Sequence, residues 1–120
     1  MGKDIWKGCF ISESLKDPTI LNNFKCYNFR ITNDNLPLGE GRTGRWHMYW
    51  IETSDPPIEL FKESMCNNWY GHFWNGNNIV AIFENKSFHL LQNDRSTWKE
   101  AIEYGKKQGI LEKQLDFLTD

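Results

Sequence analysis

Long apolar runs and an excess of positive charge are both absent from this sequence. No apolar stretch approaches the roughly 20 residues of a membrane-spanning helix. The first ten residues also lack the apolar segment of a signal peptide. The net charge is −2, whereas a surface that binds nucleic acid is usually rich in clustered Lys and Arg. We therefore expect a cytoplasmic protein outside the membrane, and nucleic acid is disfavoured as its partner.

Cysteine and histidine are scarce, and their spacing matches no metal-binding or disulfide framework. The cysteines stand apart at Cys9, Cys26 and Cys66, and an odd count is typical of reduced thiols in the cytoplasm. The histidines His47, His72 and His89 lack the short spacing of a zinc motif. A nucleophile could pair Cys9 or Cys66 with His72, but Cys66 ends a predicted helix, where the dipole disfavours a thiolate. We predict no metal, no cofactor and no catalytic residue.

Aromatic residues are the abundant class. They make up 15% of the chain, with six Trp and eight Phe, and so much ring surface favours burial in a folded core. A length of 120 residues fits one domain. We therefore expect a single folded domain over residues 1–120.

The hydrophobic periodicity predicts elements in the order β-α-β-β-α-β-β-β-α. The predicted strands are 5–13, 25–32, 45–53, 69–74, 78–84 and 87–91. The helices are predicted to begin with N-caps at Asp17 and Asp55, and with a capping box from Thr97 to Glu100. Gly109 is predicted to end the last helix. Residues 33–44, which hold three glycines and a proline, are predicted to form a long, hairpin-like loop.

Paired strands between helices indicate an α+β fold. The first six elements match the ferredoxin-like, split βαβ plan, an antiparallel sheet that a C-terminal β-meander and helix would extend. In the meander, Asn75-Gly76 is predicted to form a type I′ turn and Asn85-Lys86 a second turn.

Four stretches carry a resemblance to known sequences. They are ISESLKDPTILNNFK at 11–25, NNWYGHFW at 67–74, IVAIFENKSFHL at 79–90 and EAIEYGKKQGILEKQLDF at 100–117. Together they resemble a group of small uncharacterised prokaryotic proteins over nearly the whole chain. The resemblance implies a stand-alone domain, and it implies no activity and no site residues.

The strand predicted at 69–74 is aromatic on both faces, because Trp69 and Phe73 alternate with Tyr70 and Trp74. If helices cover only one face of the sheet, the second face is exposed or covered by the 33–44 loop or a partner. Contiguous exposed rings usually mark an interaction site. We therefore expect a small binding or interaction protein that uses an aromatic-rich sheet face and the 33–44 loop.

Two kinds of partner remain open for this face. One is a second copy of the chain, in a homodimer through the sheet, and the other is a small, flat or apolar ligand in a pocket. Stacked single-stranded nucleic acid ranks third because of the charge balance. The candidate ligand- or partner-binding residues are Arg45, His47, Trp50, Glu52, Tyr70, His72 and Trp74. The alternative is a small-molecule enzyme with Glu52 or His72 as acid or base beside the rings. We expect binding rather than catalysis.

Overall fold

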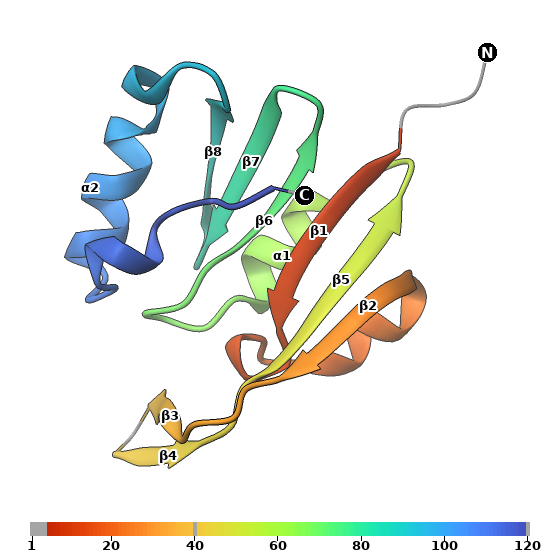
Figure 1. Ribbon diagram of the computed structural model, residues 1–120, viewed down its shortest axis with the longest axis vertical. Coiled ribbons are helices and arrows are strands. Elements are labelled where there is room, and N and C mark those ends of the chain that lie inside the picture. The colour runs from red at the N-terminus through yellow and green to blue at the C-terminus, as the bar shows by residue number, and fades with distance from the viewer. Residues whose placement is uncertain (1–4, 40, 120) are drawn as a thin grey trace.

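The computed structural model describes residues 5–39 and 41–119, and a six-stranded sheet forms its centre (Figure 1). The strands of this sheet are β1 (Trp6–Ile11), β2 (Lys25–Ile31), β5 (His47–Thr53), β6 (Gly71–Asn75), β7 (Asn78–Phe83) and β8 (Lys86–Leu91). They lie in the order β2-β5-β1-β6-β7-β8, and every neighbouring pair is antiparallel. The chain is thus an α+β protein, as the sequence predicts.

Helical segments lie on both faces of the sheet, with α1 behind it and α2 in front in the view of Figure 1. The segments associated with the first face are η1 (Ser12–Ser14), η2 (Pro18–Asn23) and α1 (Ile58–Ser64). Those associated with the second face are η3 (Arg95–Trp98), α2 (Lys99–Lys107) and η4 (Glu112–Gln114). None of the helices among the described residues has the length and apolar character needed to cross a bilayer.

The sheet separates two hydrophobic cores because successive side chains of a strand point to opposite faces. On the α1 side, Phe10 stacks on Phe61 at a ring distance of 4.2 Å and lies 5.0 Å from Phe73. On the α2 side, Phe83 and Trp98 are buried with eight further residues. Strand β7 contributes side chains to both cores, since Ile79, Ala81 and Phe83 face α2 while Ile82 faces α1.

Residues 110–119, here called the C-terminal segment, extend from α2 across β7 and β6 toward β1 (Figure 1). Leu115 and Phe117 fix this segment, because their side chains are 3% and 1% exposed. Phe117 packs edge-on against Tyr70 and Trp98, each at a ring distance of 5.3 Å. The segment and α2 together cover the β6–β8 half of this face, and the half formed by β1, β5 and β2 is covered less.

Two helix starts differ from the predictions. Helix α1 begins at Ile58 rather than after Asp55, because the residue before a proline is disfavoured in the helical region and Pro56 and Pro57 follow each other. Thr97 does not cap α2. Its hydroxyl donates to the Asp94 carbonyl and accepts from the Leu91 N–H, so it ties η3 to the end of β8.

The first crossover is also less helical than predicted. Asp17 caps it as expected, since its carboxylate accepts the Thr19 N–H at 3.1 Å, but the segment forms 3₁₀ turns instead of an α-helix. Only seven residues separate this cap from the next β-strand, so there is little room for α-helical turns. The predicted stop at Gly109 is confirmed, because Gly109 adopts a φ of +87°.

The turns of the meander are placed one residue away from their predicted positions. Asn75 pairs with Asn78, so the first loop is Gly76–Asn77. Among its two residues only Gly76 has a positive φ, +57°, as a type II′ turn requires, and the predicted type I′ turn is wrong. The second loop is Glu84–Asn85, with φ +59° at Asn85.

Residues 33–44 contain a two-stranded hairpin, β3 (Leu36–Gly39) and β4 (Arg42–Gly44), which projects from the body at the lower left of Figure 1. Glu40, a carboxylate within the predicted loop, lies outside the described residues. The Trp46 indole N–H donates to the Pro37 carbonyl at 3.0 Å and so fixes the base of this arm.

Candidate functional site

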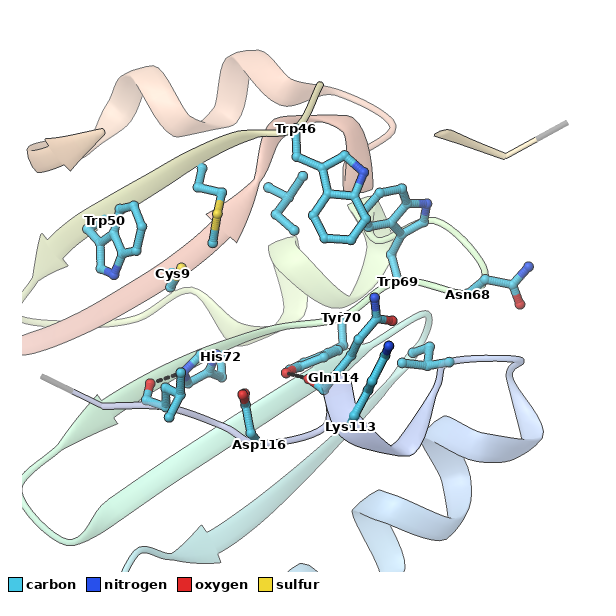
Figure 2. Close-up of a pocket in the computed structure, with 14 residues that line it drawn as sticks. Cys9, Trp46, Trp50, Asn68, Trp69, Tyr70, His72, Lys113, Gln114 and Asp116 are labelled. Atoms are coloured by element: carbon cyan, nitrogen blue, oxygen red, sulfur yellow. Dashed lines mark hydrogen bonds between the residues drawn. The ribbon is translucent and has the colours of Figure 1, made fainter. Parts of the chain in front are cut away.

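A cavity of about 340 Å³ lies where the C-terminal segment meets the less covered half of the sheet (Figure 2). Strands β1, β5 and β6 supply its floor, and the C-terminal segment supplies one wall. The cavity exists because α2 and this segment leave β1 and β5 incompletely covered.

Two rows of side chains across the strands form the floor. In the first row, Cys9 of β1 lies directly opposite Trp50 of β5 on one side and His72 of β6 on the other. In the second row, Ile11 lies opposite Met48. Residues directly opposite in an antiparallel pair share one face of the sheet, so all five side chains point toward the cavity, and they line it.

Three further rings come from positions just outside the strands. Trp46 precedes β5 and meets Trp69 edge-on, with ring centroids 5.1 Å apart. Tyr70 precedes β6, and its hydroxyl donates to the carbonyl of Gln114. Burial raises the pKa of the Tyr70 phenol, and the Asp116 carboxylate adds to this effect, so the hydroxyl remains protonated at neutral pH. These rings give the cavity a mainly aromatic lining.

The wall formed by the C-terminal segment contributes charge. Lys113 and Asp116 line the cavity, and Figure 2 shows both side chains directed from the segment toward the strands. The segment is held in place by the Tyr70–Gln114 bond and by a bond from His72 to Leu118. The apolar cavity thus has one cationic and one anionic group on its wall.

His72 is the most deeply placed polar group of the site, with 6% of its surface exposed. Its Nε2 lies 2.6 Å from the Leu118 carbonyl oxygen, which can only accept, so Nε2 carries the proton and Nδ1 has a lone pair. Nδ1 is buried and has no hydrogen-bond partner among the described residues. Burial lowers the pKa of His72, while the Leu118 carbonyl and the Asp116 carboxylate act in the opposite direction. The imidazole is therefore neutral at pH 7.

Three of the sequence-derived candidates, Trp50, Tyr70 and His72, meet in this cavity. Trp74 shares their face and lies 5.0 Å from the His72 ring, but it is only 5% exposed and does not line the cavity. Its neighbours in the α2-side core cover it.

The other three candidates lie elsewhere. His47 is on the opposite face of β5 from Trp50, because alternate residues of a strand diverge, and its Nδ1 lies 2.7 Å from a Glu13 carboxylate oxygen. Glu52 lies 3.8 Å from the Lys25 ammonium and does not line the cavity. Arg45 is exposed before the strand begins. The structure does not bring Glu52 to His72, so these two residues form no acid–base pair.

Several lining residues were not among the candidates. Lys113, Gln114, Asp116 and Leu118 could not be placed, because periodicity predicts that Leu115 and Phe117 are buried but not which strand lies beneath them. Trp46 and Trp69 were predicted as strand residues, and their meeting depends on long-range register. Cys9 was considered only as a possible partner of His72.

The described residues contain no group of three His, Cys, Asp or Glu side chains arranged to hold a metal ion. The site is therefore an aromatic cavity with a thiol, a neutral imidazole, a carboxylate and an ammonium along its lining. The chain matches no protein-family model, no curated protein and no solved structure.

Proposed function

We propose that the protein binds a small, flat, mainly apolar molecule with one polar group in the cavity beneath the C-terminal segment. The observation that carries this proposal is the aromatic lining of a pre-formed hollow, to which Trp46, Trp50 and Trp69 contribute. Small-molecule sites are typically concave and apolar with a few polar groups, and they span roughly 300–1,000 Å³. The cavity lies at the lower end of that range, which favours a ligand of one or two fused rings.

The polar groups of the wall support a ligand with a single polar end. Lys113 would receive an anionic or carbonyl oxygen, and Asp116 would receive a cationic or N–H group. No hydrogen bond or ion pair engages either side chain among the described contacts, so both are available to a ligand. The rings would provide stacking and edge-to-face contacts worth about 0.5–1.5 kcal/mol for each well-placed pair.

The indole N–H signals in a ¹H–¹⁵N NMR spectrum test this proposal directly. Three tryptophans line the cavity, and Trp6, Trp74 and Trp98 do not, so the chain carries its own internal controls. The probes are 2-naphthol, 2-naphthoate and 2-naphthylmethylamine, which share one ring system and differ in charge. We expect saturable shifts of the Trp46, Trp50 and Trp69 signals, with smaller shifts of the other three.

Two pairs of variants extend the test. Met48→Trp places a larger side chain on the cavity floor and should abolish the shifts, whereas Leu60→Trp on the exposed side of α1 should leave them intact. Lys113→Gln should weaken 2-naphthoate selectively, and Asp116→Asn should weaken 2-naphthylmethylamine. Uniform shifts of all six indoles, or none with any probe, would contradict binding in this cavity.

A homodimer is a second candidate, and the edge strand β2 favours it. Phe29 and Ile31 are 45% and 42% exposed on this strand, and an open sheet edge offers backbone groups to a second copy. A bulge between Cys26 and Asn28 would limit pairing to the later half of the strand. Sedimentation equilibrium tests this candidate. A concentration-dependent mass that Phe29→Lys abolishes supports the dimer, and a monomer mass at all concentrations excludes it.

We also infer that the first part of the sheet follows the split βαβ, ferredoxin-like plan. The antiparallel order β2-β5-β1-β6 supports this inference, with α1 as the second crossover and the 3₁₀ turns of η1 and η2 in place of the first helix. Strands β7 and β8 with α2 are then the extension. The three cysteines are thiols, which supports the proposed cytoplasmic location.

A further inference from the structure

Cys9 and His72 place a thiol and an imidazole on neighbouring strands of the cavity floor. They are directly opposite each other across β1 and β6, and such neighbours have Cβ atoms about 4.5–5.5 Å apart. Both side chains line the cavity, and Figure 2 shows Cys9 between Trp50 and His72. The thiol therefore lies on the strand beside the imidazole and faces the space that a bound molecule would occupy.

The imidazole offers a base on the strand beside this thiol, and among the described residues no hydrogen bond joins Cys9 to Nδ1. The Leu118 carbonyl holds the proton on Nε2, so the lone pair of the buried Nδ1 is the only basic position on the ring. A nucleophile is usually activated by an adjacent base that a third group orients, and here the Leu118 carbonyl is that third group. The Asp116 carboxylate on the cavity wall favours the imidazolium that forms when Nδ1 takes a proton.

We propose that Cys9 is a nucleophile that His72 activates, and that it adds to a flat aromatic ligand bearing an α,β-unsaturated carbonyl group. In this addition the Cys9 side chain rotates toward His72, Nδ1 takes the thiol proton, and the sulfur bonds to the β-carbon of the ligand. The electron pair of the carbon–carbon double bond moves through the α-carbon to the carbonyl oxygen. The proton then returns from Nδ1 to the α-carbon, so the product is a neutral thioether and no oxidant or leaving group is required.

The lining of the cavity fits this reaction. Lys113 is the only cationic side chain among the lining residues, and its ammonium can stabilise the negative oxygen of the enolate. Trp50, the other cross-strand neighbour of Cys9, offers a ring against which an aromatic ketone can pack. This inference rests on the proposed binding of a small apolar ligand in the same cavity.

The other two cysteines, Cys26 and Cys66, are internal controls for the reactivity of Cys9. Cys26 is exposed on the edge strand β2, and burial raises the pKa of the Cys66 thiol while the nearby Lys16 ammonium lowers it. Neither residue lies beside His72. A reaction that selects Cys9 therefore cannot be explained by exposure alone, since Cys26 is the more exposed thiol.

The test is competitive labelling of the whole chain with phenyl vinyl ketone, followed by peptide mass mapping at each cysteine. At pH 7 we expect Cys9 to react at least tenfold faster than Cys26. Between pH 6.5 and 8 the rate at Cys9 should depend less steeply on pH than the rate at Cys26, because the neutral imidazole can remove the thiol proton in place of hydroxide from solution. Slower labelling of Cys9 than of Cys26 overturns the proposal.

His72→Gln is the matched variant, because the glutamine amide can still donate to the Leu118 carbonyl but offers no basic nitrogen. It should lower the rate at Cys9 at least tenfold and leave Cys26 unchanged. His89→Gln, at an exposed histidine bonded to Asn78, should change neither rate. Equal Cys9 rates in the wild type and in folded His72→Gln overturn the role of the base.

A measurement on the wild-type chain keeps the test independent of the variants. Propiophenone has the shape of phenyl vinyl ketone without its reactive double bond, and it should protect Cys9 but not Cys26. Unselective labelling together with naphthol-induced shifts of the cavity indoles would overturn the thiol chemistry and leave the binding function standing. Unselective labelling without any such shifts would overturn both.

Discussion

Phe117 is the side chain whose removal best tests how the site is held together. Its ring is 1% exposed and contacts Tyr70 and Trp98, and truncating a buried Phe to Ala typically costs about 3–5 kcal/mol. Its backbone has a φ of +43°, but alanine is strained there in the same way, so Phe117→Ala gains nothing that offsets the loss. We expect this loss to undock the C-terminal segment.

Undocking has a signature at His72, because the segment both buries this imidazole and accepts its proton. In the wild type, burial keeps the pKa of His72 below its ordinary value of about 6.5. In Phe117→Ala the pKa should rise toward that value. Each pKa unit of this rise corresponds to about 1.4 kcal/mol less penalty on the charged imidazole. NMR titration of the His72 Cε1–H signal measures the pKa, and urea unfolding followed by tryptophan fluorescence measures the stability.

Leu118→Ala is the control within the same segment. Its side chain is 68% exposed and its carbonyl, which accepts the His72 proton, is retained, so both the pKa and the stability should change little. If His72 titrates alike in the wild type and in both variants, the C-terminal segment is not what shields it, and our account of the site fails.

Three further predictions concern pH, packing and the projecting hairpin. Because the pKa of His72 is lowered in the folded state, the contribution of the neutral imidazole to the free energy of unfolding is present above pH 6.5. It is lost as the pH falls, by at most about 1.4 kcal/mol per pH unit. Urea unfolding from pH 7.5 to 5.5 should show a steeper loss of stability in the wild type than in His72→Gln, and parallel curves would contradict this prediction. Gly71→Ala should cost about 1–3 kcal/mol or more, since its Cβ would overlap the Phe10 ring, whereas Gly76→Ala should cost about 1–2 kcal/mol from its positive φ alone. A smaller loss for Gly71→Ala in the same unfolding assay would contradict the packing argument. Trp46→Phe removes the indole donor that fixes the β3–β4 hairpin, at a cost of about 0.5–1.5 kcal/mol. Amide hydrogen exchange should therefore become faster in the hairpin and not in β7. Unchanged exchange in the hairpin would show that this hydrogen bond does not hold it.

Local sequence signals predicted most of the elements but not their ends. The six sheet strands were predictable because β-branched and aromatic residues alternate between recognisable turns. Asp55 failed as a cap because two prolines follow it, and Thr97 failed because its hydroxyl serves the end of β8 instead. In both cases a neighbouring constraint outweighed the capping preference.

The site was less predictable than the fold. Trp50, Tyr70 and His72 were identified as one aromatic surface, since their strand positions imply which face they share. The cavity also depends on Lys113 and Asp116, whose placement is set by Phe117 and Leu115 docking across β6 and β7. That docking is a long-range packing event with no periodic signal, and the pairing of Cys9 with His72 depends on a register that no local pattern specifies.

The division of the hydrophobic residues into two cores has a practical consequence for engineering. Phe10, Phe61 and Phe73 lie on the side of the sheet away from the cavity, and substitutions at well-separated positions usually have additive effects. Tolerance of heat could thus be raised by redesigning the α1 side while the specificity of the opposite side is altered independently. The same backbone could then serve as a scaffold for new recognition pockets on the cavity side, with the α1-side core optimised separately.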